Sequence, residues 1–248
     1  MGVGRQLDVQ HEVDIASGSD RHGIQSDRIT RCGVHRRRRG QAIENDLLPL
    51  TGSQIDPHDA MVAYLRVQNF PKALEECKKA LVKYPGNAGT QVNCGAAYIG
   101  LNMLDEALGA LNSAIRLGSP SEFLFSNLGV VYMKQEDFRS ALGAFERAAT
   151  LNDKNAVTLY NKGLAHKKLG IVEKAKADFL KAAQINPKYA EAHLNLALIY
   201  DAQGEWGRAL ESYKSFYPLA AGLPDFRLEV AHASERIKEL ESKIPKPD

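Results

Sequence analysis

Two neighbouring stretches of the chain share one pattern. Residues 122–155 read EFLFSNLGVVYMKQEDFRSALGAFERAATLNDKN, and residues 156–189 read AVTLYNKGLAHKKLGIVEKAKADFLKAAQINPKY. Both place glycine at the eighth residue and alanine at the twentieth and twenty-seventh residues. Self-similarity at a fixed spacing of 34 residues indicates a repeat architecture, in which each unit stacks on the next.

The same spacing continues on both sides of these two stretches. Three sets of residues recur every 34 positions. An alanine set consists of Ala73, Ala107, Ala141, Ala175 and Ala209. A ring-bearing set consists of Tyr64, Tyr98, Tyr132, His166 and Tyr200, and a mostly small set consists of Met61, Gly95, Gly129, Gly163 and Ala197. We expect the small residues to lie where two helices cross closely, for example Gly129 against Ala141.

This pattern resembles the tetratricopeptide repeat (TPR) family over residues 54–223. The resemblance implies an all-α fold, a right-handed α-solenoid or superhelix of five helix-turn-helix units. The five expected repeats are 54–87, 88–121, 122–155, 156–189 and 190–223. In the second repeat we expect helices at roughly 89–101 and 105–117.

Residues 224–243 predict a capping helix for the last repeat. Apolar residues recur at helical spacing among charged ones, at Leu228, Ala231, Ile237 and Leu240. The end of a stack of repeats has a bare apolar face, and a half-polar helix is the usual cover. Residues 244–248 are expected to be a frayed tail.

Residues 1–53 differ in composition from the rest of the chain. The first fifty residues hold eight Arg and no Lys, and they show no sustained helical or strand period. We expect a disordered Arg-rich arm and linker. Its Arg36–Arg39 run has three interpretations: a basic address or phosphate-binding arm, a solvated charge run, or non-native sequence upstream of the true start.

The overall composition excludes several classes of protein. The 248 residues carry a net charge of +2, which argues against a surface built throughout to bind nucleic acid or anionic lipid. There is no long apolar run and no secretory signal, so a cytoplasmic location is expected. Cys77 and Cys94 occupy small core positions, so we expect two free buried thiols.

The resemblance places particular side chains in the concave groove formed by the first helix of each repeat. The sixth position gives a row of amides, Asn93, Asn127, Asn161 and Asn195, which resembles the asparagine ladders of some superhelical repeat proteins. An Asn amide can pair with both the C=O and the N–H of a peptide backbone. Neighbouring positions supply an apolar floor and a basic wall: Val130, Leu164, Leu198, Lys134, Lys167 and Lys168.

These features predict a non-catalytic scaffold or adaptor that binds a peptide or helix with acidic and apolar residues. We find no phosphate loop, HExxH or CxxC motif, and we predict no enzyme activity, cofactor or metal site. His166 replaces a packing tyrosine and is expected to pack. Two alternatives stay open: an accessory subunit that docks through its convex face or cap, and an arm that binds nucleic acid or an anionic surface. Self-association into a homodimer through an exposed end is a further option.

Overall fold

The computed structural model describes residues 56–244, and within that range the regular structure is entirely helical. The expected arm, with its Arg36–Arg39 run, and the last four residues of the tail lie outside the described residues. Ten helices form five antiparallel pairs, followed by a 3-10 turn and a final helix. The pairs are α2 (Pro57–Arg66) with α3 (Phe70–Lys83), α4 (Ala88–Gly100) with α5 (Leu104–Arg116), α6 (Glu122–Lys134) with α7 (Phe138–Leu151), α8 (Ala156–Lys168) with α9 (Val172–Ile185), and α10 (Ala190–Ala202) with α11 (Trp206–Ala220).

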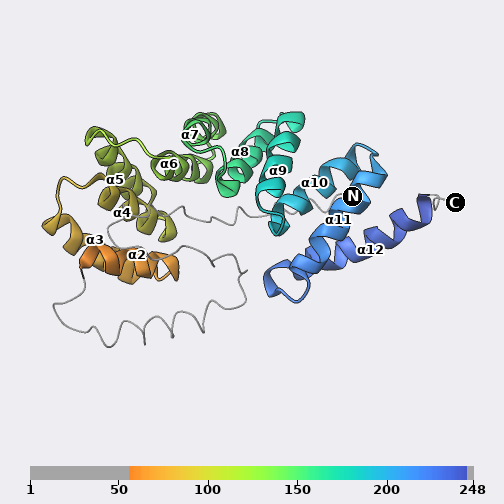
Figure 1. Cartoon of the computed structure of the whole chain (residues 1–248), viewed down its shortest axis with the longest axis horizontal. Helices are drawn as coiled ribbons and strands as arrows, with labels where there is room; N and C mark the ends of the chain where they lie inside the picture. Colours follow the sequence, from red (N-terminus) through yellow and green to blue (C-terminus); the bar gives the residue numbers. More distant parts are fainter. Residues whose placement is uncertain (1–55, 245–248) are drawn as a thin grey trace.

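The pairs stack in chain order. Figure 1 shows α2 and α3 at one end of the stack and the last helix, α12 (Arg227–Lys243), at the other. The buried apolar residues accordingly form three successive clusters along the chain. The fold is therefore an α-solenoid, in which each helix pair is stabilised by its neighbours.

Local sequence signals set the helix bounds. Six helices begin after a residue whose side-chain oxygen accepts a hydrogen bond from a backbone N–H of the first turn, at Asp56, Asn69, Asn87, Ser121, Asp137 and Asn155. The helices of the second pair begin and end one residue earlier than the sequence predicts. The turn inside each pair holds one residue with positive φ, namely Gln68, Asn102, Glu136, Gly170 and Gly204.

The small residues of the repeat lie where the two helices of a pair cross. A Cβ at Gly129 would come within 2.5 Å of the Phe145 ring, and one at Gly163 within 2.7 Å of Phe179. The side chain nearest to Gly129 is therefore Phe145, and the expected contact with Ala141 stays a prediction. The large residue four positions after the alanine fills the crossing, because Phe145 is fully buried and aims its ring at the glycine.

The capping helix packs on α11 through a different stripe than expected. Leu240 is fully buried as predicted, and Ile237 is partly buried, but Leu228 is 67% exposed and Ala231 is exposed. Ala233 is fully buried in their place. The prediction was wrong at Leu228 and Ala231, because the face of α12 that packs on the core runs through Val230, Ala233, Ile237 and Leu240.

A disulfide joins Cys77 to Cys94, with Cα atoms 5.5 Å apart and a sequence separation of 17. The prediction of two free thiols is therefore wrong. The sequence places the two residues on neighbouring helices, but it does not show that their side chains point toward each other. Among residues 56–244, no helix is long and apolar enough to cross a membrane.

Candidate functional site

The first helices of the pairs form the inner row of the solenoid. Helices α2, α4, α6 and α8 touch in succession, whereas the second helices of the described pairs make no comparable contacts with one another. A stack in which one row is closer together than the other curves toward the closer row. The candidate site therefore lies on the face of α4, α6, α8 and α10.

The predicted row of asparagines lies on this inner row, but it is buried. Asn93 and Asn127 are 0% exposed, Asn195 is 2% and Asn161 is 4% exposed. Four amides open along their length to a ligand are therefore not present. Two of them, Asn161 and Asn195, differ in how their amide groups are satisfied.

Asn195 is saturated by contacts within the protein. Its Oδ1 accepts a hydrogen bond from Lys167 Nζ at 2.7 Å, and its Nδ2 donates to the Tyr160 hydroxyl at 3.3 Å and to the Glu191 carbonyl at 3.0 Å. The Asn195 amide therefore holds the Lys167 ammonium at the edge of α10. In this state it positions a charge and does not itself offer a donor to a ligand.

Asn161 lacks the equivalent partner. Its Nδ2 is buried and has no hydrogen-bond acceptor within residues 56–244. The residue of the preceding pair that corresponds to Tyr160 is Ser126, whose side chain is too short to take the place of the phenol. A buried amide N–H without a partner costs about 1–3 kcal/mol, so an acceptor from a ligand would be favourable here.

The predicted apolar floor is only partly accessible. Val130 is 2% exposed and belongs to the buried core of the middle pairs. Leu164 and Leu198 are partly buried and pack at the margin of the core. Leu164 and Leu198 are therefore the two predicted floor residues with apolar surface left for a partner.

Three lysines give the same face a positive charge. Lys134 Nζ donates to Asn102 Oδ1 at 3.3 Å, and the Lys168 ammonium lies 5.8 Å from the centre of the Phe138 ring. Burial lowers the pKa of Lys134, and burial together with the neighbouring Lys168 charge lowers the pKa of Lys167. Within the part of the chain that the structure describes, none of the three lysines forms an ion pair with a carboxylate. An anionic group on a partner would therefore stabilise the charged form of these lysines.

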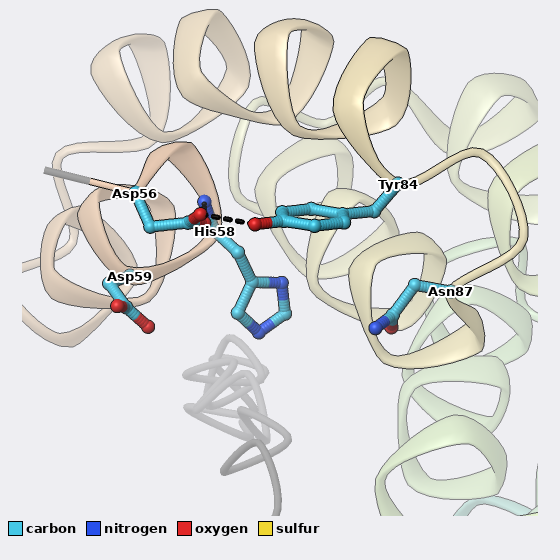
Figure 2. Close-up of a pocket in the computed structure, with 5 residues that line it drawn as sticks. All are labelled: Asp56, His58, Asp59, Tyr84 and Asn87. Atoms are coloured by element: carbon cyan, nitrogen blue, oxygen red, sulfur yellow. Dashed lines mark hydrogen bonds between the residues drawn. The ribbon is translucent and has the colours of Figure 1, made fainter. Parts of the chain in front are cut away.

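A polar pocket of about 340 Å³ lies at the start of the solenoid and was not predicted from the sequence. It is lined by Asp56, His58, Asp59, Tyr84 and Asn87 (Figure 2). The Tyr84 hydroxyl and the Lys83 ammonium both donate to the Asp56 carboxylate. Burial acts to raise the pKa of Asp56, but these hydrogen bonds and one from the His58 backbone outweigh it and lower the pKa to about 2. The hydrogen bonds to Asp56 therefore link the start of α2 to the end of α3.

A buried ionic cluster on α8 and α9 was also missed. His166 is 4% exposed, and its Nδ1 lies 2.7 Å from Asp178 Oδ2, while Lys162 Nζ lies 2.8 Å from Asp178 Oδ1. His166 thus occupies a packing position and is paired with a carboxylate of the next helix. Among the described residues, no group of three or more His, Cys, Asp or Glu side chains is arranged to hold a metal ion.

Sequence-family models described as tetratricopeptide repeat match three segments of the chain. The matched residues are 124–157, 156–189 and 179–211. These segments run from within α6 into α11, the region that holds Asn161, Asn195 and the three lysines. No curated protein matches the chain at a significant level.

Several solved structures share the fold. TTC0263, a TPR protein of Thermus thermophilus, superposes with a TM-score of 0.60 at 20% identity, covering 72% of this chain and 97% of its own. PilF of Pseudomonas aeruginosa has a TM-score of 0.60 at 19% identity, over 76% of this chain and 96% of its own. YrrB, a TPR protein with an unusual peptide-binding site, has a TM-score of 0.55 at 24% identity, over 78% of this chain and 98% of its own. At these identities the similarity establishes the fold alone.

Proposed function

Because this chain is a tetratricopeptide repeat protein, we propose that it is a non-catalytic interaction scaffold whose inner face binds a partner segment. The coarser part of this statement, a protein–protein interaction scaffold, is supported by the matches to tetratricopeptide repeat models. The finer part concerns the place and chemistry of binding. It identifies the surface of α6, α8 and α10 as the binding face, and an acidic and apolar peptide or helix as the ligand.

One observation carries the proposal: three lysines on the first helices of the pairs have no carboxylate partner within residues 56–244, and two leucines of the same row of helices are only partly buried. Lys134, Lys167 and Lys168 supply the charge, and Leu164 and Leu198 supply apolar surface. A cation that is already partly desolvated loses less hydration when a carboxylate reaches it, which favours acidic partners. An amphipathic segment could then place its apolar side chains on the leucines.

The four asparagines have three roles in this proposal. Asn195 is a positioning residue that holds Lys167, and the buried Nδ2 of Asn161 donates to a backbone or side-chain oxygen of the ligand. Asn93 and Asn127 are fully buried, so they belong to the core beneath the inner face.

The test is capture of the partner by the full chain, followed by titration of the captured protein. The Lys167→Glu/Lys168→Glu variant reverses two charges on the inner face. We expect its affinity to fall by at least about tenfold, which corresponds to 1.4 kcal/mol, with a weaker dependence on salt.

A matched control is Lys174→Glu/Lys188→Glu, which makes the same charge change at exposed residues outside the inner row. We expect this control to bind like the unchanged chain, with both variants retaining helical circular dichroism. Equal binding by the inner-face variant and the unchanged chain would refute the proposed site.

Docking through the cap is the second candidate, favoured by one observation. Leu228 on α12 is 67% exposed, and Trp206 at the start of α11 is 46% exposed. Large apolar side chains with this much exposure at one end of the solenoid could contact a larger assembly. In that case Leu228→Ser would abolish capture, and the inner-face lysine variant would leave it intact.

A further inference from the structure

The disulfide between Cys77 and Cys94 lies at the junction of the first helix pair with the rest of the solenoid. Cys77 is on α3 and Cys94 is on α4, so the bond joins the last helix of one pair to the first helix of the next. Both cysteines are 0% exposed. In addition to the main chain between α3 and α4, the disulfide links the α2–α3 pair covalently to α4.

The residue at the position of Cys77 is large in every other pair. The corresponding side chains, all fully buried, are Leu111, Phe145, Phe179 and Tyr213. Each of Leu111, Phe145 and Phe179 packs on a glycine of its partner helix, whereas Cys77 is paired with Met61 at the glycine position. In the first pair, the larger residue of this contact, Met61, is therefore on the first helix, and the smaller one, Cys77, is on the second. This arrangement leaves a small side chain pointing toward α4.

The fully buried part of the apolar cluster at this junction is made mostly of small residues, and larger side chains pack around it partly buried, namely Tyr64, Phe70, Leu74, Leu81 and Tyr98. Besides Met61 and Leu65, its buried members are the two cysteines and four alanines, namely Ala73, Ala96, Ala97 and Ala110. Small side chains bury less apolar area than leucine or phenylalanine, so each contributes less to docking. Polar contact across the junction includes the hydrogen bond between His58 Nδ1 and Thr90 Oγ1 at 3.0 Å. The covalent bond thus joins the small buried residues of the junction, while the Phe70 ring of α3 packs on Gly100 of α4 at its partly exposed margin.

We propose that the Cys77–Cys94 disulfide is a reducible staple whose redox state decides whether the first helix pair stays docked on α4. The co-reactant is a dithiol reductant of the thioredoxin or dithiothreitol class. One thiolate of the reductant attacks a sulfur of the bond, and the other Cys sulfur leaves as a thiolate and takes a proton. The second thiolate of the reductant then displaces the remaining Cys sulfur, which also takes a proton, so the reductant is oxidised to a disulfide as two electrons pass to the protein.

Burial couples this exchange to motion of the helix pair. Because neither sulfur is exposed, a reductant reaches the bond only when α2 and α3 separate locally from α4. Once reduced, the pair keeps only the non-covalent contacts of the junction, which include the Phe70 ring on Gly100 and the hydrogen bond between His58 and Thr90. Separation removes Val62 and Arg66 from the inner row and uncovers the buried face of α4, including Ala97.

The test compares the full chain in oxidised and reduced form, with Cys32→Ser to remove the third cysteine. Backbone amide hydrogen exchange is read by mass spectrometry for α2 and α3, and for α8 and α9 as an internal reference. On reduction by dithiothreitol, we expect exchange in α2 and α3 to rise by at least about tenfold, with α8 and α9 unchanged.

The matched variant is Cys77→Ala/Cys94→Ala in the same background, which cannot form the bond. We expect its α2 and α3 amides to exchange like those of the reduced chain, with or without dithiothreitol. The reduced chain itself supplies the test if the double variant does not fold. Equal exchange in the oxidised and reduced chains would overturn the proposal, and so would two alkylatable thiols at Cys77 and Cys94 after purification under oxidising conditions. No ligand enters this experiment, so its result is independent of the proposed inner-face site.

Discussion

At the scale of single residues, the turn inside each helix pair uses a left-handed backbone regardless of which amino acid is present. Gly170 and Gly204 adopt it with φ of 75° and 73°, whereas Asn102 and Glu136 adopt it with φ of 59°. The left-handed region costs an ordinary L-residue about 1–2 kcal/mol, and Asn tolerates it better because its side chain bonds locally. The chain therefore carries backbone strain at Glu136 that two other turns avoid.

Glu136→Gly should accordingly stabilise the protein. Relief of the strain exceeds the extra entropy that glycine loses on folding, so we expect a gain of about 0.5–1 kcal/mol in urea unfolding. The reverse change, Gly170→Ala, should cost about 1 kcal/mol, because no atom lies within 4 Å of the added Cβ and the backbone alone opposes it. A loss of stability in Glu136→Gly would contradict this account.

Asp56 predicts a pH dependence of the first helix pair. Its pKa is lowered from 3.8 to about 2, so the folded state favours the carboxylate more than the unfolded state does. The stabilisation is fully present above pH 4 and is lost as the pH falls toward 2. At pH 7, Asp56→Asn should therefore cost about 1–2 kcal/mol in thermal unfolding, and the difference from the unchanged chain should shrink between pH 4 and pH 2. A difference that stays constant down to pH 2 would show that the charge of Asp56 is not the cause.

At the scale of helices, two glycines of the α6–α7 pair differ in whether a larger side chain would fit. Gly129 faces the fully buried Phe145 ring, whereas a Cβ at Gly143 on α7 would meet nothing within 4 Å. Gly143→Ala should stabilise the protein by about 1 kcal/mol through helix propensity. Gly129→Ala gains the same propensity but forces Phe145 to move, so we expect a net loss of about 1–2 kcal/mol. Urea unfolding of the two variants measures both signs, and a stabilised Gly129→Ala would exclude the proposed crossing.

The helix pairs could be predicted from the sequence because the 34-residue spacing repeats the features that set them. Glycines at helix crossings, such as Gly129, recur at this spacing, and so do residues that cap helix starts, such as Asn155. Features present once in the chain gave weaker predictions. The disulfide depends on the directions of two side chains, and the buried face of α12 depends on how that helix packs on the last cluster. The Asn195 contacts depend on Lys167 and Tyr160 from the preceding pair.

At the scale of the whole molecule, each helix pair is stabilised by its neighbours in the stack. The three apolar clusters follow one another along the chain, and α12 closes the last of them. Arg236 on α12 fixes this closure through two hydrogen bonds to Asp201 on α10, at 2.7 and 2.6 Å. In a solenoid of this kind, a destabilising substitution at one end should lower the stability of the helices near that end only.

Leu240→Ala tests this local character. Leu240 is fully buried on the last cluster, and removal of its side chain should cost about 2–5 kcal/mol in the units it contacts. We expect amide hydrogen exchange to accelerate in α10, α11 and α12, with α4 and α5 unchanged, because no member of the second cluster packs on α12. Uniform acceleration along residues 56–244 would instead mean that the described helices unfold as one cooperative unit. The inner face and the first junction would then respond to the state of the cap as well.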